Sequence, residues 1–300
     1  MGMRGSLMLL LALTTACGGQ GFAGGEEISE TKSELGAAPC LKRVALATGV
    51  ELEYLEQGSA RGQPVIFIHG FTDSHHSFDR NLPIFPRSFH VFALDLRGHG
   101  DSSKPPCCYS QADFAGDVVA FMDALGLSRA SLVGHSMGSF VAHRVAVDFP
   151  ERLDKLVLIG SAPTLAGNPV ALDFETTVDT LTDPIDPEFV REFQSSTFFR
   201  PIPEAFLDTA VMESLKVPAT VWQQALDGLI ADDHSAELAD VTAPTLILYG
   251  DRDIFFTAAE EAALDALIPD SELISYQDVG HGTHVEIPSR VVRDIAGFLR

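Results

Sequence analysis

Gly134-His135-Ser136-Met137-Gly138 is the stretch that decides both the fold and the chemistry of this 300-residue chain. It follows the apolar run 130–133 and precedes a helical pattern at 139–146. A serine between two glycines, where a strand changes into a helix, is typical of a nucleophile elbow. Such a sharp turn strains the serine backbone, and side chains two residues before and after it would collide. The pattern therefore predicts that Ser136 is a nucleophile with a helix N-terminus behind it.

Strand-like and helix-like patterns alternate along most of the chain. Continuous apolar runs, typical of strands buried on both faces, occupy residues 64–68, 90–94, 130–133, 156–159 and 245–249. Shorter strand patterns lie at 43–47, 51–55 and 272–276. Helical patterns occupy residues 114–125 and 258–267. The alternation predicts an α/β fold with a mostly parallel sheet flanked by helices, in which ligands bind beyond the carboxyl ends of the strands.

The N-terminal segment has the pattern of a signal peptide over residues 1–17. Arg4 supplies a positive start, residues 7–13 are apolar but too few to span a bilayer, and small residues precede Cys17. Because this pattern resembles the lipobox of bacterial lipoproteins, we expect Cys17 to be lipidated, with ordinary cleaved secretion as the alternative. Residues 18–40 are Gly-rich and acidic and predict a flexible tether. The protein is then exported and faces the periplasm or the exterior, either anchored or secreted.

One long segment interrupts the alternation of strands and helices. Residues 163–239 contain no buried-strand run and are rich in Phe, Leu, Asp and Pro. We predict a helical cap there, inserted into a core made of residues 41–162 and 240–300. Most of its large apolar side chains are expected to pack the cap against the core, and one or two of them to line an apolar pocket as well. These side chains are Phe174, Phe189, Phe193, Phe198, Phe199, Phe206, Met212 and Trp222.

Composition excludes several classes of partner. With 42 acidic and 20 basic residues, the net charge of −22 argues against nucleic-acid binding and against a basic patch for anionic lipids, which leaves the N-terminal anchor as the only predicted membrane contact. Once Cys17 is set aside, Cys40 could bond either of the adjacent cysteines 107 and 108, those two could bond each other, or no disulfide could form. The cysteines lack metal-site spacing, so we expect neither a metal nor a cofactor.

A nucleophilic serine needs a base and an acid that orients the base. His281 lies on a loop between two glycines, just after the last predicted strand, and is the preferred base; His284 is its rival. Asp253 follows the buried strand 245–249 and is the preferred acid, whereas Asp251 comes second because aspartate often forms turns. The chain order Ser136, Asp253, His281 is the one expected for an elbow serine in a parallel α/β sheet.

Two backbone N–H groups are candidates for an oxyanion hole. Phe71 follows the strand 64–68 and the turn-forming Gly70, and Met137 begins the helix behind Ser136. Donors at these two places would face the negative charge that develops on the oxygen of an attacked carbonyl. His69 is expected to order the loop through hydrogen bonds rather than to act in catalysis.

Five motifs together resemble the α/β-hydrolase superfamily over residues 43–300. They are His69-Gly70-Phe71, Asp95–Ser102, Gly134–Gly138, Gly250–Asp253 and Gly280-His281. The resemblance is to the branch of serine esterases and monoacylglycerol-lipase-like hydrolases. It implies the α/β-hydrolase fold with an inserted helical cap, and a structural role for Asp95–Ser102, in which Arg97 pairs with core carboxylates.

For function, the resemblance implies hydrolysis of small-molecule carboxylic esters through an acyl-serine, without a cofactor. A carbon–carbon bond hydrolase or a lactonase could use the same triad, and a non-catalytic binding protein on this fold is a third interpretation. Dehalogenases and epoxide hydrolases of the superfamily use an aspartate nucleophile, so Ser136 argues against both. Acyl-chain length and oligomeric state stay open.

Overall fold

The computed structural model describes residues 14–15 and 37–300. The predicted signal peptide, including Cys17, lies outside the described residues except for residues 14–15. The predicted tether lies outside them as far as residue 36. None of the described helices is long and apolar enough to cross a membrane.

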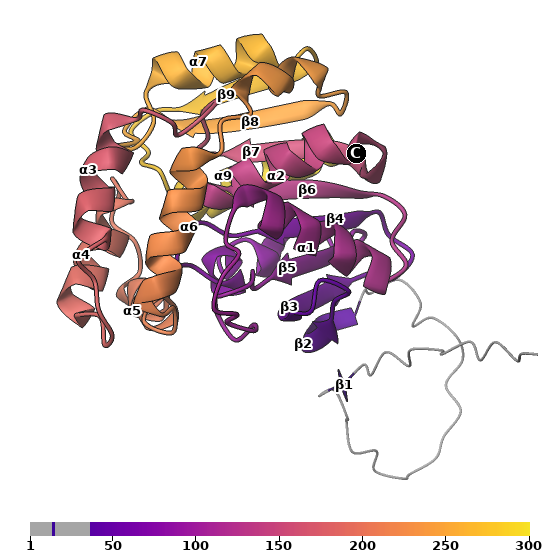
Figure 1. Ribbon diagram of the computed structural model, residues 1–300. Coiled ribbons are helices and arrows are strands. Elements are labelled where there is room, and N and C mark those ends of the chain that lie inside the picture. The colour runs from indigo at the N-terminus through magenta and orange to yellow at the C-terminus, as the bar shows by residue number, and fades with distance from the viewer. Residues whose placement is uncertain (1–13, 16–36) are drawn as a thin grey trace, which may run out of the picture.

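A nine-stranded sheet in the order β1-β2-β3-β5-β4-β6-β7-β8-β9 forms the centre of the described structure (Figure 1). Pairing is antiparallel from β1 to β5 and parallel from β5 to β9, which confirms the predicted mostly parallel sheet. The strands are β1 (Thr14–Thr15), β2 (Ala37–Ala45), β3 (Glu51–Gly58), β4 (Pro64–Ile68), β5 (His90–Leu94), β6 (Ala130–His135), β7 (Leu153–Ile159), β8 (Thr245–Gly250) and β9 (Ser271–Tyr276).

Strand β2 begins earlier than the sequence pattern indicates. Residues 37–40, the end of the predicted tether, are part of it, because Ala37 pairs with Gly58 at the far end of β3 across an irregularity in the register. This pairing partner lies 21 positions along the chain, so local composition does not reveal it.

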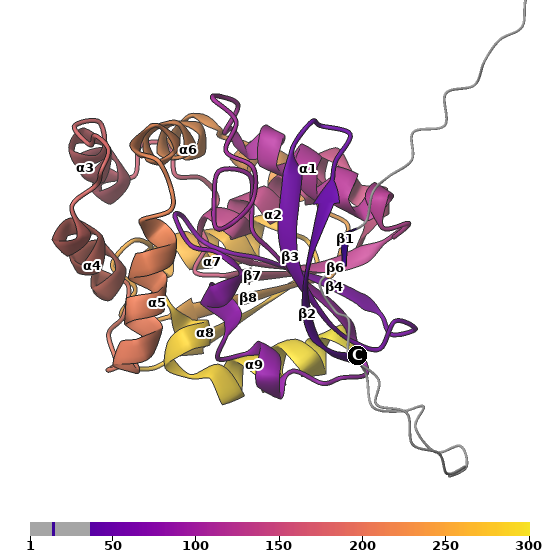
Figure 2. The ribbon, with the colours of Figure 1, turned by 90° about the horizontal axis from the view of Figure 1, so that it is seen from below.

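Helices cover both faces of the sheet (Figure 2). Alternate residues of a strand point to opposite faces, and in β4 the side chains of Ile66 and Ile68 join the hydrophobic core under α1, α2 and α7, whereas Val65 and Phe67 join the core under α9. The flanking helices are α1 (Gln111–Ala124), α2 (Met137–Asp148), α7 (Ala258–Leu267), α8 (Thr283–Glu286) and α9 (Pro288–Leu299). The 3-10 helices are η1 (His75–Phe78), η2 (Leu82–Ile84), η3 (Pro150–Arg152) and η4 (Ser235–Asp240).

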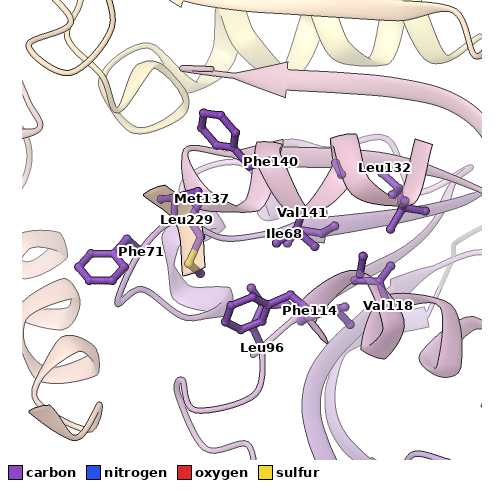
Figure 3. Packing of buried hydrophobic residues seen from close by; sticks show 14 of the residues in the cluster. Ile68, Phe71, Leu96, Phe114, Val118, Leu132, Met137, Phe140, Val141 and Leu229 are labelled. Atoms are coloured by element: carbon purple, nitrogen blue, oxygen red, sulfur yellow. The ribbon is translucent and has the colours of Figure 1, made fainter. Parts of the chain in front are cut away.

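The start of α2 is anchored in the larger of the two cores. Met137 and Val141 pack there beside Ile68 of β4 (Figure 3), and all three side chains are fully buried. Burying side chains of this size stabilises the fold by roughly 1.5–3 kcal/mol each. The helix that follows Ser136 is therefore held rigidly against the strand that precedes Phe71.

Four α-helices follow β7 and precede β8, where the sequence analysis expects a cap. They are α3 (Pro169–Val178), α4 (Pro187–Ser196), α5 (Glu204–Ser214) and α6 (Ala219–Ala231), and Figure 1 shows them as a layer at one end of the sheet. Proline at the first turn and the side chains of Asn168 and Asp186 cap the starts of α3 and α4. Trp222 of α6 is fully buried and packs edge-on against Phe71 of the core, with ring centroids 5.3 Å apart.

Of the disulfide pairings left open by the sequence, the structure contains the vicinal bond between Cys107 and Cys108. Cys40 is therefore bonded to neither of them. The bond lies in the loop before α1, and the carbonyl of Cys108 accepts a hydrogen bond from Nη1 of Arg97.

Candidate active site

Ser136 lies between β6 and α2 with the strained backbone angles φ 51° and ψ −123°. A Cβ added to Gly134 would overlap the main chain of Gly138, and one added to Gly138 would overlap the carbonyl of Ile68. Both glycines are thus required by backbone contacts, for the steric reason that the sequence predicts. The N–H of Ser136 donates to the carbonyl of Ile159 at 2.9 Å, which fixes the turn to β7.

A second set of hydrogen bonds holds the elbow from behind. The hydroxyl of Ser139 donates to the carbonyl of Ser136 at 2.6 Å, and its oxygen lies 2.8 Å from Oγ of Ser161. The N–H of Ser161 in turn donates to Oε1 of Glu261, whose burial raises the pKa of its carboxyl well above the usual value. Ser139 therefore has a structural task at the position directly after the elbow glycine.

His281 and Asp253 meet beyond the carboxyl ends of β9 and β8. Nδ1 of His281 lies 2.7 Å from Oδ2 of Asp253, and both side chains are buried. The other carboxylate oxygen of Asp253 accepts hydrogen bonds from the N–H groups of Phe255 and Phe256, at 2.8 Å and 3.1 Å. The carboxylate is thus satisfied on both oxygens and fixed in orientation.

The two rival residues have other partners. Asp251 accepts a hydrogen bond from the N–H of Asp278 at 2.6 Å and so closes a turn. Nε2 of His284 lies 3.1 Å from the hydroxyl of Ser77, and burial lowers the pKa of its imidazole to about 3, so it stays neutral. Neither residue contacts Asp253 or Ser136 through a hydrogen bond in the described part of the chain.

Ser136, His281 and Phe71 line one cavity, together with side chains from the four helices between β7 and β8. The Ser136 hydroxyl makes no hydrogen bond to His281 or to any other described residue. Hydrogen bonds between a nucleophile and its base are often long or misaligned until substrate binds. The structure thus brings the predicted nucleophile and the predicted base to one cavity, with no hydrogen bond between them.

The loop after β4 presents the N–H of Phe71. It turns tightly at Gly70, whose carbonyl accepts from the N–H of Asp73 at 3.3 Å, and Thr72 adopts the left-handed φ of 62°. Met137 is the first residue of α2, so its N–H has no partner within the helix. Neither N–H donates to another residue that the structure describes, so both are free to bind an anion.

Sequence reasoning did not identify the polar residues that join this loop to the helices above it. Nε2 of Gln194, on α4, donates to Oδ1 of Asp73 at 3.0 Å and to Oγ of Ser214 at 2.8 Å. Oγ of Ser214, at the end of α5, lies 3.2 Å from Oγ1 of Thr72. The position of Asp73, two residues after Phe71, is the one sequence signal that could have pointed to this network.

The helices above the cavity contribute more lining side chains than the sequence predicts. Of the eight large apolar residues named for the cap, four line the cavity: Phe174, Phe193, Phe198 and Phe206. Phe199 and Met212 are instead more than half exposed, at 54% and 58%. The expectation that one or two would line a pocket is therefore too low.

The loop Asp95–Ser102 has the structural role that the sequence analysis assigns to it. Arg97 binds Asp117 of α1 through Nε and Nη2, at 2.5 Å and 2.7 Å. Burial opposes ionisation of Asp95, but hydrogen bonds from His75 and from the N–H of Asp101 outweigh it and lower the pKa of Asp95 to about 2. Neither Arg97 nor Asp95 lines the cavity.

No group of three or more His, Cys, Asp or Glu residues within 14–15 and 37–300 is arranged to hold a metal ion. The arrangement of Ser136, His281 and the two N–H groups fits the predicted roles of nucleophile, general base and anion binding.

Known proteins with similar sequences and structures point to one family. Residues 63–288 match the family model described as alpha/beta hydrolase fold. Lipase 3 of Moraxella sp. (strain TA144) is 26% identical over 280 residues, which cover 86% of this chain and 84% of that protein. Non-heme chloroperoxidase of Streptomyces lividans is 26% identical over 277 residues, which cover 86% of this chain and 99% of the relative.

A solved structure agrees with these relatives. A thermophilic esterase from Thermogutta terrifontis superposes with a TM-score of 0.77 and 27% identity, over 88% of this chain and 98% of the esterase. Because relatives of similar identity carry different names, they identify a family and leave the substrate open.

Proposed function

This chain belongs to the α/β-hydrolase family, and from that premise we propose that it is a serine hydrolase that cleaves carboxylic esters of small molecules. The observation that carries the proposal is the 2.7 Å hydrogen bond between His281 and Asp253, on a ring that lines the same cavity as Ser136. A buried histidine oriented by a carboxylate is the base that a serine hydroxyl needs.

The first half of the reaction forms an acyl-serine. Because the Asp253 carboxylate only accepts hydrogen bonds, Nδ1 of His281 carries its proton and Nε2 is the base. As Oγ of Ser136 attacks the ester carbonyl, its proton passes to Nε2, and Asp253 stabilises the resulting imidazolium. His281 then gives this proton to the alcohol oxygen, the bond between that oxygen and the acyl carbon breaks, and the acyl group stays on Ser136.

The second half repeats the chemistry with water. His281 takes a proton from a water molecule that attacks the acyl carbon, and then returns it to Oγ of Ser136 as the acid departs. In both halves the N–H groups of Phe71 and Met137 bind the negatively charged oxygen. Such a donor contributes about 10²- to 10³-fold in rate.

The apolar lining of the cavity supports an acyl chain as the group transferred to Ser136. Phe174, Leu226 and Leu229 come from the inserted helices, and Phe255 and Phe256 come from the loop that carries Asp253. Apolar surface removed from water stabilises the bound state by roughly 25 cal/mol per Å².

Hydrolysis of p-nitrophenyl esters from acetate to palmitate tests the proposal. We expect turnover by the wild type and none by Ser136→Ala. Ser131→Ala is a matched control, because this serine lies on β6, the strand that precedes Ser136, is fully buried, and its hydroxyl has no hydrogen-bond partner among the described residues. Turnover that survives Ser136→Ala would remove Ser136 as nucleophile, and a wild type inactive on every chain length would favour a carbon–carbon bond hydrolase, a lactonase or a binding protein.

We further propose that the protein is exported and lipidated at Cys17. The sequence pattern at residues 1–17 supports this assignment. Metabolic labelling with palmitate in a bacterial host should mark the wild type and not Cys17→Ser. A wild type without label would contradict the anchor and favour plain secretion.

A further inference from the structure

The cavity is lined by side chains of two kinds. Most are apolar, such as Phe174, Leu226 and Leu229, whereas Asp73, Gln194 and Glu213 are polar and are called the polar wall below. No lysine or arginine within the described part of the chain lines the cavity. The polar wall therefore offers two carboxyl groups to a bound molecule. The lining side chains that can carry positive charge are histidines, and His76 among them pairs with Asp79.

The carboxyl group of Asp73 is held by neutral donors alone. Gln194 donates to Oδ1 at 3.0 Å, and the hydroxyl of Ser77 donates to Oδ2 at 3.3 Å. Burial raises the pKa of Asp73 to about 6, against the opposing effects of these hydrogen bonds and of the nearby His281. Above that pH the carboxylate is charged, and no lysine or arginine described here forms an ion pair with it.

Glu213 provides an independent sign that a donor group belongs here. Its Oε1 pairs with Nζ of Lys216 at 2.9 Å, whereas Oε2 is fully buried and has no hydrogen-bond partner among the described residues. The residue as a whole is only 7% exposed, and it lines the cavity. A buried carboxylate oxygen without a donor is costly, so a ligand that supplies a donor is favoured.

We propose that the polar wall of Asp73, Gln194 and Glu213 binds the alcohol portion of the ester through an uncharged or cationic hydrogen-bond-donating group, such as a hydroxyl, amide or ammonium, and excludes a carboxylate. This inference rests on the proposed ester hydrolysis and names its substrate class. It follows from the acceptors on this wall, because donors pair with them and a second anion is repelled.

The placement of the wall assigns it to the alcohol rather than to the acyl group. Ser77 bonds both Asp73 and His284, and the ring of His284 lies 4.2 Å from that of His135, which lies 4.9 Å from His281. Asp73 also lies close enough to His281 for the charge of the histidine to lower the pKa of Asp73, so this part of the polar wall is near the residue that delivers a proton to the departing alcohol. The apolar side chains that line the rest of the cavity suit the acyl chain.

Butyrate esters that differ only in the alcohol test this assignment. Carbamoylmethyl and carboxymethyl butyrate have the same shape, but the first ends in an NH₂ donor and the second in an anionic oxygen. 2-Hydroxyethyl and propyl butyrate differ by a hydroxyl in place of a methyl group. For the full-length protein we expect kcat/KM to favour carbamoylmethyl over carboxymethyl by about a hundredfold, and hydroxyethyl over propyl by about tenfold.

The variants Asp73→Asn and Glu213→Gln separate the effect of the wall from the intrinsic reactivity of the esters. Each should lower the ratio of carbamoylmethyl to carboxymethyl turnover by about tenfold. Glu192→Gln is the matched control, because it removes one negative charge from α4 at an exposed position that does not line the cavity, and its ratio should equal that of the wild type.

The outcomes distinguish this inference from the proposed function. If all four esters are hydrolysed with similar kcat/KM, or if neither variant changes the ratio, the alcohol subsite is wrong while ester hydrolysis stands. If none of the esters is hydrolysed, or if hydrolysis persists in Ser136→Ala, the proposed function is wrong and the subsite is overturned with it.

Discussion

The main chain of Gly160 lies directly against the ring of His281: a Cβ built on Gly160 would be 2.8 Å from Nδ1 and 2.9 Å from Cε1. Gly160 follows β7 and adopts a φ of +56°, which L side chains rarely adopt. The space beside the end of β7 is thus needed by the imidazole ring at Nδ1, the atom that bonds Asp253. Small displacements of a catalytic group have large effects on rate.

Gly160→Ala should therefore lower kcat even where the protein stays folded. Moving the His281 ring by a fraction of an ångström weakens its bond to Asp253, and we expect kcat for a p-nitrophenyl ester to fall by about 10²-fold. Gly167→Ala is the matched control, because Gly167 also has a positive φ, of +75°, but has no atom within 4 Å of the added Cβ. Equal kcat values for the two variants would contradict this role of Gly160.

The choice of acid is tested by two aspartate-to-asparagine substitutions. Asp253→Asn should lower kcat by about 10⁴-fold, because an amide at this place favours the wrong tautomer of the histidine. Asp251→Asn removes a turn-forming carboxylate and should change kcat by no more than a few-fold. Steady-state kinetics of both variants show which aspartate orients His281. A larger loss of kcat in Asp251→Asn than in Asp253→Asn would identify Asp251 as the acid of the triad.

Gln194 couples the inserted helices to the loop that carries Phe71. Gln194→Leu leaves Oδ1 of Asp73 without its donor. We expect kcat to fall about tenfold, and a trifluoromethyl ketone, which mimics the tetrahedral intermediate, to bind less tightly by a similar factor. Gln223→Leu is the control: Nε2 of Gln223 donates to the carbonyls of residues 178, 179 and 181, so this change weakens the helices without touching the Phe71 loop.

If the two glutamine variants lost ketone affinity equally, the coupling between Gln194 and the oxyanion loop would be wrong. Loss of thermal stability in both variants, with loss of ketone affinity in Gln194→Leu alone, is the predicted pattern. The unfolding midpoint measured beside the kinetics identifies a variant that simply fails to fold.

Stability should rise between pH 5 and pH 7. Burial lowers the pKa of six histidines, so the unfolded chain takes up protons near pH 6.5 that the folded chain does not bind, and their contribution to stability is lost as pH falls through that range. These histidines are His69, His99, His135, His143, His234 and His284. Burial also raises the pKa of Asp73 and Glu261. These raised values lower stability as pH rises, opposite to the effect of the histidines, but they involve fewer groups.

Urea unfolding at several pH values measures this effect. The free energy of unfolding should increase from pH 5 to pH 7, as expected when the unfolded state binds more protons. A free energy that is constant or decreases over this range would contradict the prediction.

Most of the fold could be predicted because its signals are local. The apolar runs at 64–68, 90–94 and 245–249 coincide with β4, β5 and most of β8, and the predicted helix 258–267 coincides with α7. The order of the motifs along such a sheet also predicts which loops meet at its carboxyl edge. That is why His281 and Asp253, 28 positions apart, could be paired from the pattern of strands and loops.

The rest could not be predicted because it depends on contacts between distant segments. Asp73 and Gln194 are 121 positions apart, and they meet because of how α4 packs above the sheet. No sequence motif marks Gly160, and its role in leaving space for the His281 ring is seen only in the structure. The disulfide remained open for another reason: the sequence alone does not favour a bond between adjacent cysteines over one to Cys40.

The central claim, that Ser136 is the nucleophile, is tested most directly by mass spectrometry after reaction with a fluorophosphonate, which bonds covalently to activated serines. We predict one adduct per chain, on the peptide that contains Ser136, and a rate of labelling that falls sharply in His281→Gln. An adduct on a different residue, or equal labelling of Ser136→Ala, would contradict the account.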